Sequence, residues 1–284
     1  MKIISNGLAL QKFKRKSEKA EKGYMRALEI VIAIIIVVGF STSSNAGFDE
    51  EFQTIPTRPK VTQSFVLIRP SGEPQASVIL FSGSNGALNL SPERIAQWKP
   101  TNFLLRNRVR FAEHGFLVAA TDAPSDRHDL YNFRTTSAHA EDVRGVIAAL
   151  RKIASVPVWL VGTSMGTISA GNAAARLKES GADGLVLTSS VTINLRRNES
   201  LEYVRLEEVT LPTLIVHHES DGCRICPYGG AQALLKRLKQ APKKEFLSFK
   251  GGDPPQSGSC DALSYPGFLG LDAEVVRAIA DWIK

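Results

Sequence analysis

Beyond about residue 60, short apolar stretches alternate with longer ones in which apolar residues recur three and four positions apart. The short stretches are rich in Val, Ile, Leu and Phe, which is typical of strands buried on both faces. They are residues 64–68, 77–81, 116–121, 156–161, 184–188, 213–217 and 245–249. The longer ones predict helices over residues 102–113, 137–153, 165–178, 231–239 and 273–283. This alternation predicts an α/β fold with a mostly parallel central sheet flanked by helices.

The pattern of the N-terminal part is different and indicates an export signal. Residues 30–40 (IVIAIIIVVGF) follow Arg26 and precede small polar residues that end at Ala46. We expect cleavage after Ala46, and we expect the true start at Met25, which puts Arg26 directly before the apolar run. The run is shorter than the roughly 20 residues of a membrane span. The chain is therefore expected in the periplasm or outside a bacterial cell, with no stable membrane span; an uncleaved membrane anchor is the alternative.

Net charge and composition narrow the classes of function. The formal charge is +7, but eight basic and three acidic residues precede residue 47, which leaves +2 for residues 47–284. A nearly neutral folded part argues against nucleic-acid binding. With 43% hydrophobic and 22% charged residues, the composition is that of a packed soluble core. Residues 1–46 are thus expected to be extension and signal peptide, the polar residues 47–60 a linker, and residues 61–284 one domain.

The candidate for chemistry is a G-x-S-x-G motif made by Gly162, Ser164 and Gly166, between a predicted strand and a predicted helix. Such a turn exposes the serine hydroxyl at a helix N-terminus, where the next N–H, that of Met165, can stabilise an oxyanion. The two glycines are needed because the backbones crowd at a turn this tight. The competing interpretation is a glycine-rich turn with an incidental serine.

Several further motifs carry a family resemblance. They are FSGSNG at residues 81–86, NFLLR at 102–106, DAPSD at 122–126, WLVGTS at 159–164 and HHESD at 217–221. In this combination the chain resembles the α/β-hydrolase superfamily, and within it secreted bacterial dienelactone-hydrolase-like proteins of largely unassigned substrate. The resemblance spans residues 61–284. It implies a serine hydrolase of esterase type that acts on a small-molecule ester without a cofactor, and residues 190–212 leave little room for a large cap domain.

The same resemblance implies roles for individual residues. The Ser84 N–H would join the Met165 N–H as an oxyanion donor, although residues 82–86 also make a good plain turn. Asp221 would be the acid that orients a catalytic histidine. Glu219 is a weaker candidate for that acid, and Asp221 itself has an alternative interpretation as a turn residue before a glycine.

Three cysteines, Cys223, Cys226 and Cys260, all lie late in the chain. Cys223 and Cys226 form a C-x-x-C pair, which permits a redox interpretation. The resembling proteins have cysteines at positions 223 and 260, which implies a structural disulfide between them and a free Cys226. The adjacent His217 and His218 would point to opposite faces of a strand, so we expect no metal site.

A serine nucleophile needs a base, and the expected one is missing. In this fold the histidine comes last in chain order, yet none of the five histidines follows Asp221, and Pro266 occupies the expected position. Three explanations are open: a natural loss of catalysis that leaves a ligand-binding homologue, a sequence error or recent mutation, or a base from elsewhere. His128, in the loop after residues 116–121, is the best substitute.

Overall fold

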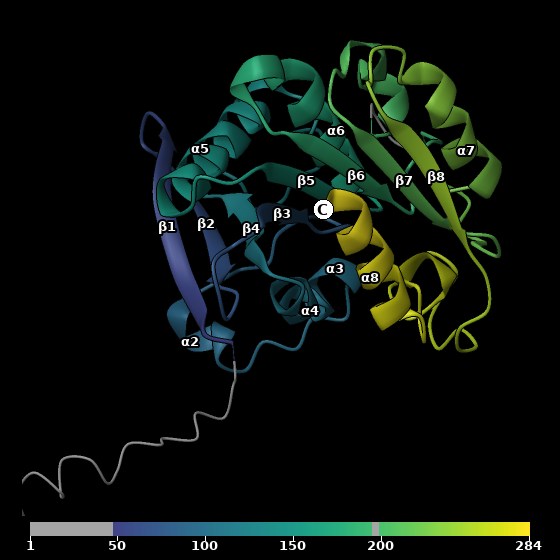
Figure 1. Ribbon diagram of the computed structural model, residues 1–284, viewed down its shortest axis with the longest axis horizontal. Helices are drawn as coiled ribbons and strands as arrows, with labels where there is room; N and C mark the ends of the chain where they lie inside the picture. Colours follow the sequence, from purple (N-terminus) through teal and green to yellow (C-terminus); the bar gives the residue numbers. More distant parts are fainter. Residues whose placement is uncertain (1–47, 195–198) are drawn as a thin grey trace, which may run out of the picture. The chain divides into compact units, whose positions relative to one another are not determined.

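The computed structural model describes residues 48–194 and 199–284 (Figure 1). The predicted signal peptide and the proposed start at Met25 lie outside the described residues. Within the described part, none of the helices has the length and hydrophobicity required to cross a bilayer.

The described residues form one eight-stranded sheet with the strand order β1-β2-β4-β3-β5-β6-β7-β8. The strands are β1 Glu50–Arg58, β2 Val61–Ile68, β3 Ala76–Phe81, β4 Phe116–Pro124, β5 Val158–Thr163, β6 Gly184–Thr188, β7 Thr213–His218 and β8 Lys244–Phe249. β1 and β2 run antiparallel to their neighbours, and the other six are parallel. The mostly parallel sheet predicted from the sequence is confirmed.

The prediction of a linker over residues 47–60 is wrong, because this segment contains β1. Glu50 pairs with Ile68 and Ile55 with Gln63 in an antiparallel ladder. Only one side of β1 has a neighbouring strand, so the strand is half-buried and lacks the apolar run of the central strands. Pro56 is tolerated because an edge strand has N–H positions that need no partner.

Helices cover both faces of the sheet (Figure 1). They are α2 Pro92–Ile95, α3 Phe103–Arg106, α4 Arg108–Glu113, α5 Ser137–Ile153, α6 Gly166–Leu177, α7 Tyr228–Arg237 and α8 Asp272–Ile283. Buried residues of α5, α6 and α7 belong to one hydrophobic core, and those of α3, α4 and α8 belong to a second core on the other face. All five predicted helices are present. The first is divided at Asn107, whose side-chain amide donates to the Phe103 carbonyl and to Asp272 and so competes with the regular backbone pattern.

The edge formed by the carboxyl ends of the parallel strands carries no large cap domain. In the described residues between β6 and β7, the only helical pieces are short 3₁₀ turns at Leu201–Tyr203 and Leu206–Glu208. The site at this edge is built from the loops that follow β3, β4, β5, β6, β7 and β8.

Candidate active site

Ser164 lies at a sharp turn between β5 and α6. Its φ is +51°, in the left-handed region that non-glycine residues rarely adopt. The two glycines of the motif make the turn possible. A Cβ on Gly162 would lie 2.5 Å from the Gly166 carbonyl oxygen, and a Cβ on Gly166 would lie 2.1 Å from the Phe81 carbonyl oxygen. The turn therefore presses against the end of β3 and raises the serine above the sheet.

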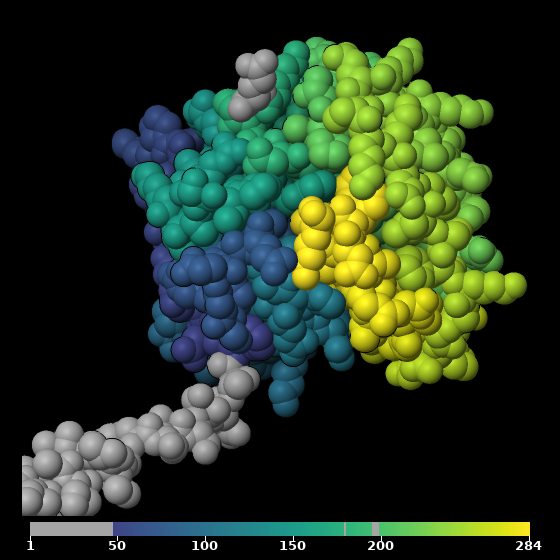
Figure 2. All heavy atoms as spheres, in the orientation of Figure 1, coloured from purple at the N-terminus to yellow at the C-terminus, as the bar shows by residue number. Residues whose placement is uncertain are grey.

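Two cavities meet at Ser164, with volumes of about 480 and 490 Å³. Both are lined by Ser84, Ser164, Cys260 and Asp261. The first extends over Asn102, Phe103, Leu263 and Pro266, and the second over Tyr131, Met165, Ile193, Arg224 and Ile225. The loop after β3 and the segment that precedes α8 both line the first cavity. Figure 2 shows the yellow C-terminal segment packed against blue and green segments from earlier in the chain.

Two backbone N–H groups beside Ser164 are available to a ligand. Ser84 has a φ of +55°, and a Cβ on its neighbour Gly83 would lie 2.9 Å from the Ser164 Cβ. In the described structure neither the Ser84 N–H nor the Met165 N–H donates a hydrogen bond. Unpaired N–H groups on this loop and at the start of α6 are suited to binding a negatively charged oxygen.

The Ser164 hydroxyl lies beside the thiol of Cys226. Cys226 is buried, and its pKa is raised above the ordinary value for a thiol. Desolvation is the main cause of the raised pKa and the negative charge of Asp221 is the second, whereas the nearby Ser164 hydroxyl acts in the opposite direction. The thiol is therefore protonated at neutral pH and does not serve as a base for Ser164.

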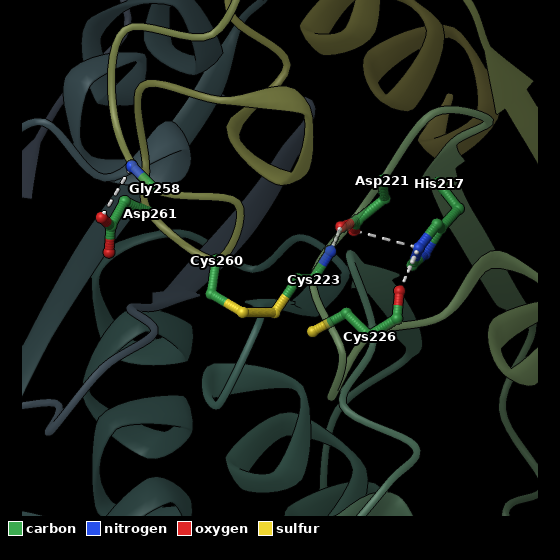
Figure 3. The surroundings of a disulfide bond; sticks show 7 residues. All are labelled: His217, Asp221, Cys223, Cys226, Gly258, Cys260 and Asp261. Carbon is green, nitrogen blue, oxygen red and sulfur yellow. Dashed lines mark hydrogen bonds and ion pairs between the residues drawn. A yellow bond between two sulfur atoms is a disulfide. The ribbon is translucent and has the colours of Figure 1, made fainter.

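Asp221 lies in the loop after β7, with a fully buried carboxylate (Figure 3). Its Oδ1 accepts a hydrogen bond from the Cys223 N–H at 2.8 Å, and its Oδ2 lies 3.2 Å from His217 Nε2. The same Nε2 lies 2.9 Å from the Cys226 carbonyl oxygen. Because both neighbours of Nε2 are acceptors, this nitrogen carries a hydrogen. Asp221 lines neither cavity and reaches the surroundings of Ser164 through Cys226.

The Cys223–Cys260 disulfide is present and Cys226 is a free cysteine, as the resemblance implied. The bond joins the loop that carries Asp221 to the loop that lines the first cavity (Figure 3). A C-x-x-C pair that exchanges electrons between Cys223 and Cys226 is therefore contradicted, because Cys223 has a different partner.

None of the five histidines lines either cavity at Ser164. His128 is exposed in the loop after β4, so the structure does not bring the predicted substitute base to these cavities. His217 and His218 are buried, on opposite faces as predicted: His217 contacts Tyr228, and His218 stacks on Tyr265 with ring centroids 4.6 Å apart.

Pro266 does line the first cavity together with Ser164. It lies in a short 3₁₀ turn, Tyr265–Gly267, and its carbonyl oxygen accepts a hydrogen bond from the Ser189 hydroxyl at 2.7 Å. The structure thus gathers Ser164, Met165, Ser84 and Pro266 around the two cavities. It leaves Glu219 exposed at the end of β7.

Two contacts of the site were missed from the sequence. One is the Cys226 thiol at Ser164, for which the only signal was its position five residues after Asp221. The other is Arg106, whose guanidinium donates to the carbonyl oxygens of Ala262 and Gly267 and pairs with Asp272 at 2.7 Å. Arg106 thereby holds the cavity loop that contains Pro266, which gives the NFLLR motif a structural explanation.

No protein-family model matches the chain, and no curated protein matches its sequence. Solved structures do match its fold. A cold-adapted esterase from an Arctic intertidal metagenomic library matches with a TM-score of 0.57 at 15% identity, over 86% of this chain and 97% of the esterase. A dienelactone hydrolase from Anabaena variabilis matches with a TM-score of 0.55 at 16% identity, over 83% and 97%. A serine hydrolase without a lid from Xanthomonas campestris matches with a TM-score of 0.52 at 16% identity, over 81% and 95%. With the strand order and the serine turn described above, these likenesses show that the chain has the α/β-hydrolase fold.

Proposed function

We propose that the chain is an exported serine hydrolase of esterase type, with Ser164 as its nucleophile. The observation that carries the proposal is the left-handed Ser164 on a strand–helix turn where two cavities meet. A residue held in this costly conformation points to a functional constraint. The esterases and hydrolases among the structural neighbours support the same class of reaction.

In the proposed reaction the Ser164 Oγ attacks the carbonyl carbon of an ester. A bond forms between Oγ and carbon, the serine proton is transferred to a base, and the carbonyl oxygen becomes negatively charged. The N–H groups of Met165 and Ser84 would stabilise this oxygen. The alcohol then leaves with a proton, and water hydrolyses the acyl-enzyme to the carboxylic acid and free serine. Asp221 would orient the base.

The substrate is proposed to be a small ester whose acyl and alcohol parts occupy the two cavities. Each cavity is large enough for a small organic group and each mixes apolar with polar lining residues. No cofactor takes part in this chemistry. Location outside the cytoplasm is supported by the disulfide, because such bonds persist in oxidising compartments.

The described residues around Ser164 include no histidine that could accept its proton. Pro266 cannot accept a proton, and no histidine lines the cavities. Turnover by the natural chain is therefore expected to be slow. A catalytically silent, ligand-binding homologue is the competing function, and the experiment below separates the two.

The test is covalent labelling by a fluorophosphonate, in which a bond from Ser164 Oγ to phosphorus forms and fluoride leaves. We expect mass spectrometry to find the label on Ser164 in the natural chain and none in Ser164→Ala. Ser257→Ala is a matched control, because Ser257 lines the first cavity away from the turn, and it should be labelled like the natural chain. Failure of the folded natural chain to react would favour the ligand-binding function.

A further inference from the structure

A buried arginine, Arg134, lies behind the loop of residues 82–86. Its side chain is only 2% exposed, and its Nη2 donates a hydrogen bond to the Ser84 carbonyl oxygen at 2.8 Å. The N–H of Leu130 donates to the next carbonyl oxygen, that of Asn85, also at 2.8 Å. Two consecutive carbonyl groups of the loop are therefore held by the segment that precedes α5.

These two bonds hold a conformation that the loop would not adopt unaided. Ser84 is left-handed, with a φ of +55°, which costs a non-glycine residue roughly 1–2 kcal/mol. Gly86, which follows Asn85, has a φ of +79° that favours glycine, and a Cβ there would lie 2.6 Å from the Leu130 side chain and 2.7 Å from Arg134 Nη2. The arginine thus packs directly on the loop as well as binding it.

The burial of Arg134 is not explained by an ion pair. Arg58, Arg106 and Arg108, which are also buried or half-buried, each pair with a carboxylate. In the described structure Arg134 Nε and Nη1 have no hydrogen-bond partner. The neighbouring carboxylate of Glu199 accepts a hydrogen bond from the Asn132 N–H instead.

A buried guanidinium with unpartnered N–H groups is unfavourable for the stability of the fold. Burial lowers the pKa of Arg134 to about 10, which still leaves it charged at neutral pH. An incompletely paired buried charge destabilises the fold. Among the described residues the Ser84 carbonyl oxygen accepts its hydrogen bond, Glu199 and Asp129 act on its charge from nearby, and the Tyr131 ring centroid lies 5.9 Å from it. This loss of stability is explained if the position of Ser84 is required for function.

The geometry points to Arg134 as a positioning residue that fixes the Ser84 N–H beside Ser164 for binding the oxyanion. This inference rests on the proposed function, in which the Ser84 N–H is one of two oxyanion donors. Arg134 touches the loop rather than the substrate, so its effect is on the rate of the chemical step more than on binding. A lysine at this position would keep the charge and lose the planar fork that reaches the carbonyl.

The experiment compares Arg134→Met and Arg134→Lys with Arg127→Met. Arg127 is the matched control because it is exposed, lies in the same segment and stacks on Phe133 without contacting the 82–86 loop. Hydrogen exchange of peptides covering residues 82–90 reports the position of the loop without requiring activity. The rate of fluorophosphonate labelling at saturating reagent reports the chemical step, and thermal unfolding reports the fold.

Arg134→Met should lose exchange protection in residues 82–90 and not elsewhere, and its saturating labelling rate should fall by about 10- to 100-fold, toward the loss seen on removing one oxyanion donor. The apparent reagent affinity should change little. Arg134→Lys should recover part of the rate, and Arg127→Met should match the natural chain. Unchanged exchange protection in a folded Arg134→Met would overturn the inference, as would an unchanged labelling rate. If Ser164 is unlabelled in the natural chain while Arg134→Met still loosens the loop, the proposed function fails and the positioning of the loop stands.

Discussion

The Ser164 hydroxyl lies beside the sulfur of Cys226. Sulfur is a weak acceptor, and the raised pKa of this thiol leaves it protonated. The candidate nucleophile therefore lies beside a thiol that cannot take its proton. This one contact links the free cysteine, the acid loop and the serine turn.

Cys226 is predicted to resist alkylation in the native protein. It is only 1% exposed and its thiolate is disfavoured, and thiol reactivity depends on both properties. Iodoacetamide at pH 8 should leave native Cys226 unmodified for hours and modify it rapidly in urea. Peptide mapping without reductant should recover Cys223 joined to Cys260, and a native Cys226 that reacts as fast as a free thiol would contradict the buried placement.

Gly166→Ala is predicted to destabilise the fold and distort the serine turn. Its Cβ would lie 2.1 Å from the Phe81 carbonyl oxygen, and backbone atoms cannot move aside as flexible side chains can. We expect a loss of about 1–3 kcal/mol in the free energy of unfolding, together with loss of fluorophosphonate labelling.

Gly229→Ala is the matched control, because nothing lies within 4 Å of a Cβ there. Gly229 is in α7, where alanine is favoured over glycine by up to about 1 kcal/mol. This variant should be as stable as the natural chain or more so. Equal unfolding midpoints for the two alanine variants would mean that the crowding at Gly166 is relieved by movement of the turn.

The central strands and long helices could be predicted because burial on both faces leaves a strong pattern in the sequence. Gly184–Thr188 and Ser137–Ile153 have their predicted bounds. The edge strand β1 was mistaken for a linker because one-sided pairing permits polar residues and a proline. The break at Asn107 depends on an amide contact with Asp272, which is far away in the sequence, so no local pattern could show it.

The part of the site that depends on local backbone geometry could be predicted from the sequence. The G-x-S-x-G spacing requires the tight turn, and Ser164 is found on one. Contacts between loops could not be predicted in the same way. Arg134 reaches Ser84 across fifty positions of sequence, and Cys226 meets Ser164 from a different strand end. The distance from His128 to Ser164 likewise depends on the path of the loop after β4, for which the sequence has no local pattern.

His139 is predicted to make the fold sensitive to mild acid. It is fully buried in α5 and burial lowers its pKa from 6.5 to about 3, with the charges of Arg134 and Arg58 acting in the same direction. Between these values the unfolded chain binds a proton that the folded chain does not, so the free energy of unfolding falls as the pH falls from 6.5 toward 3. The slope is about 1.4 kcal/mol per pH unit.

His139→Leu removes this group at similar volume. Denaturant unfolding at pH 7.5 and 5.0 should show that the natural chain loses about 2 kcal/mol more than the variant. His128→Ala is the control, because it removes a histidine that lies exposed in the loop after β4. Identical pH dependence of the natural chain and His139→Leu would show that His139 does not titrate differently in the folded state.

Pro266→His is predicted to raise esterase activity. Pro266 lines the cavity that Ser164 also lines, and position 266 follows the serine and Asp221 in the chain order of this fold. Two other residues hold the backbone of this loop. Ser189 donates a hydrogen bond to the Pro266 carbonyl oxygen, and Arg106 donates one to the Gly267 carbonyl oxygen. A new side chain at 266 therefore starts from an anchored loop on the wall of the cavity.

The size of the gain follows from the cooperation of a serine, a base and an acid, since loss of one member removes most of the rate. Restoring the base should increase turnover of a nitrophenyl ester on the order of 10³-fold if the other groups are aligned. The gain will be smaller if proline has shifted the loop, because it restricts its own φ and the preceding residue. Pro266→Ala releases that restriction without adding a base, so its activity should stay at the natural level.

His128→Ala should also leave the rate unchanged, because His128 lines neither cavity. If Pro266→His is inert and His128→Ala abolishes an active natural chain, the base is His128, and the loop that follows β4 must close over Ser164 during the reaction.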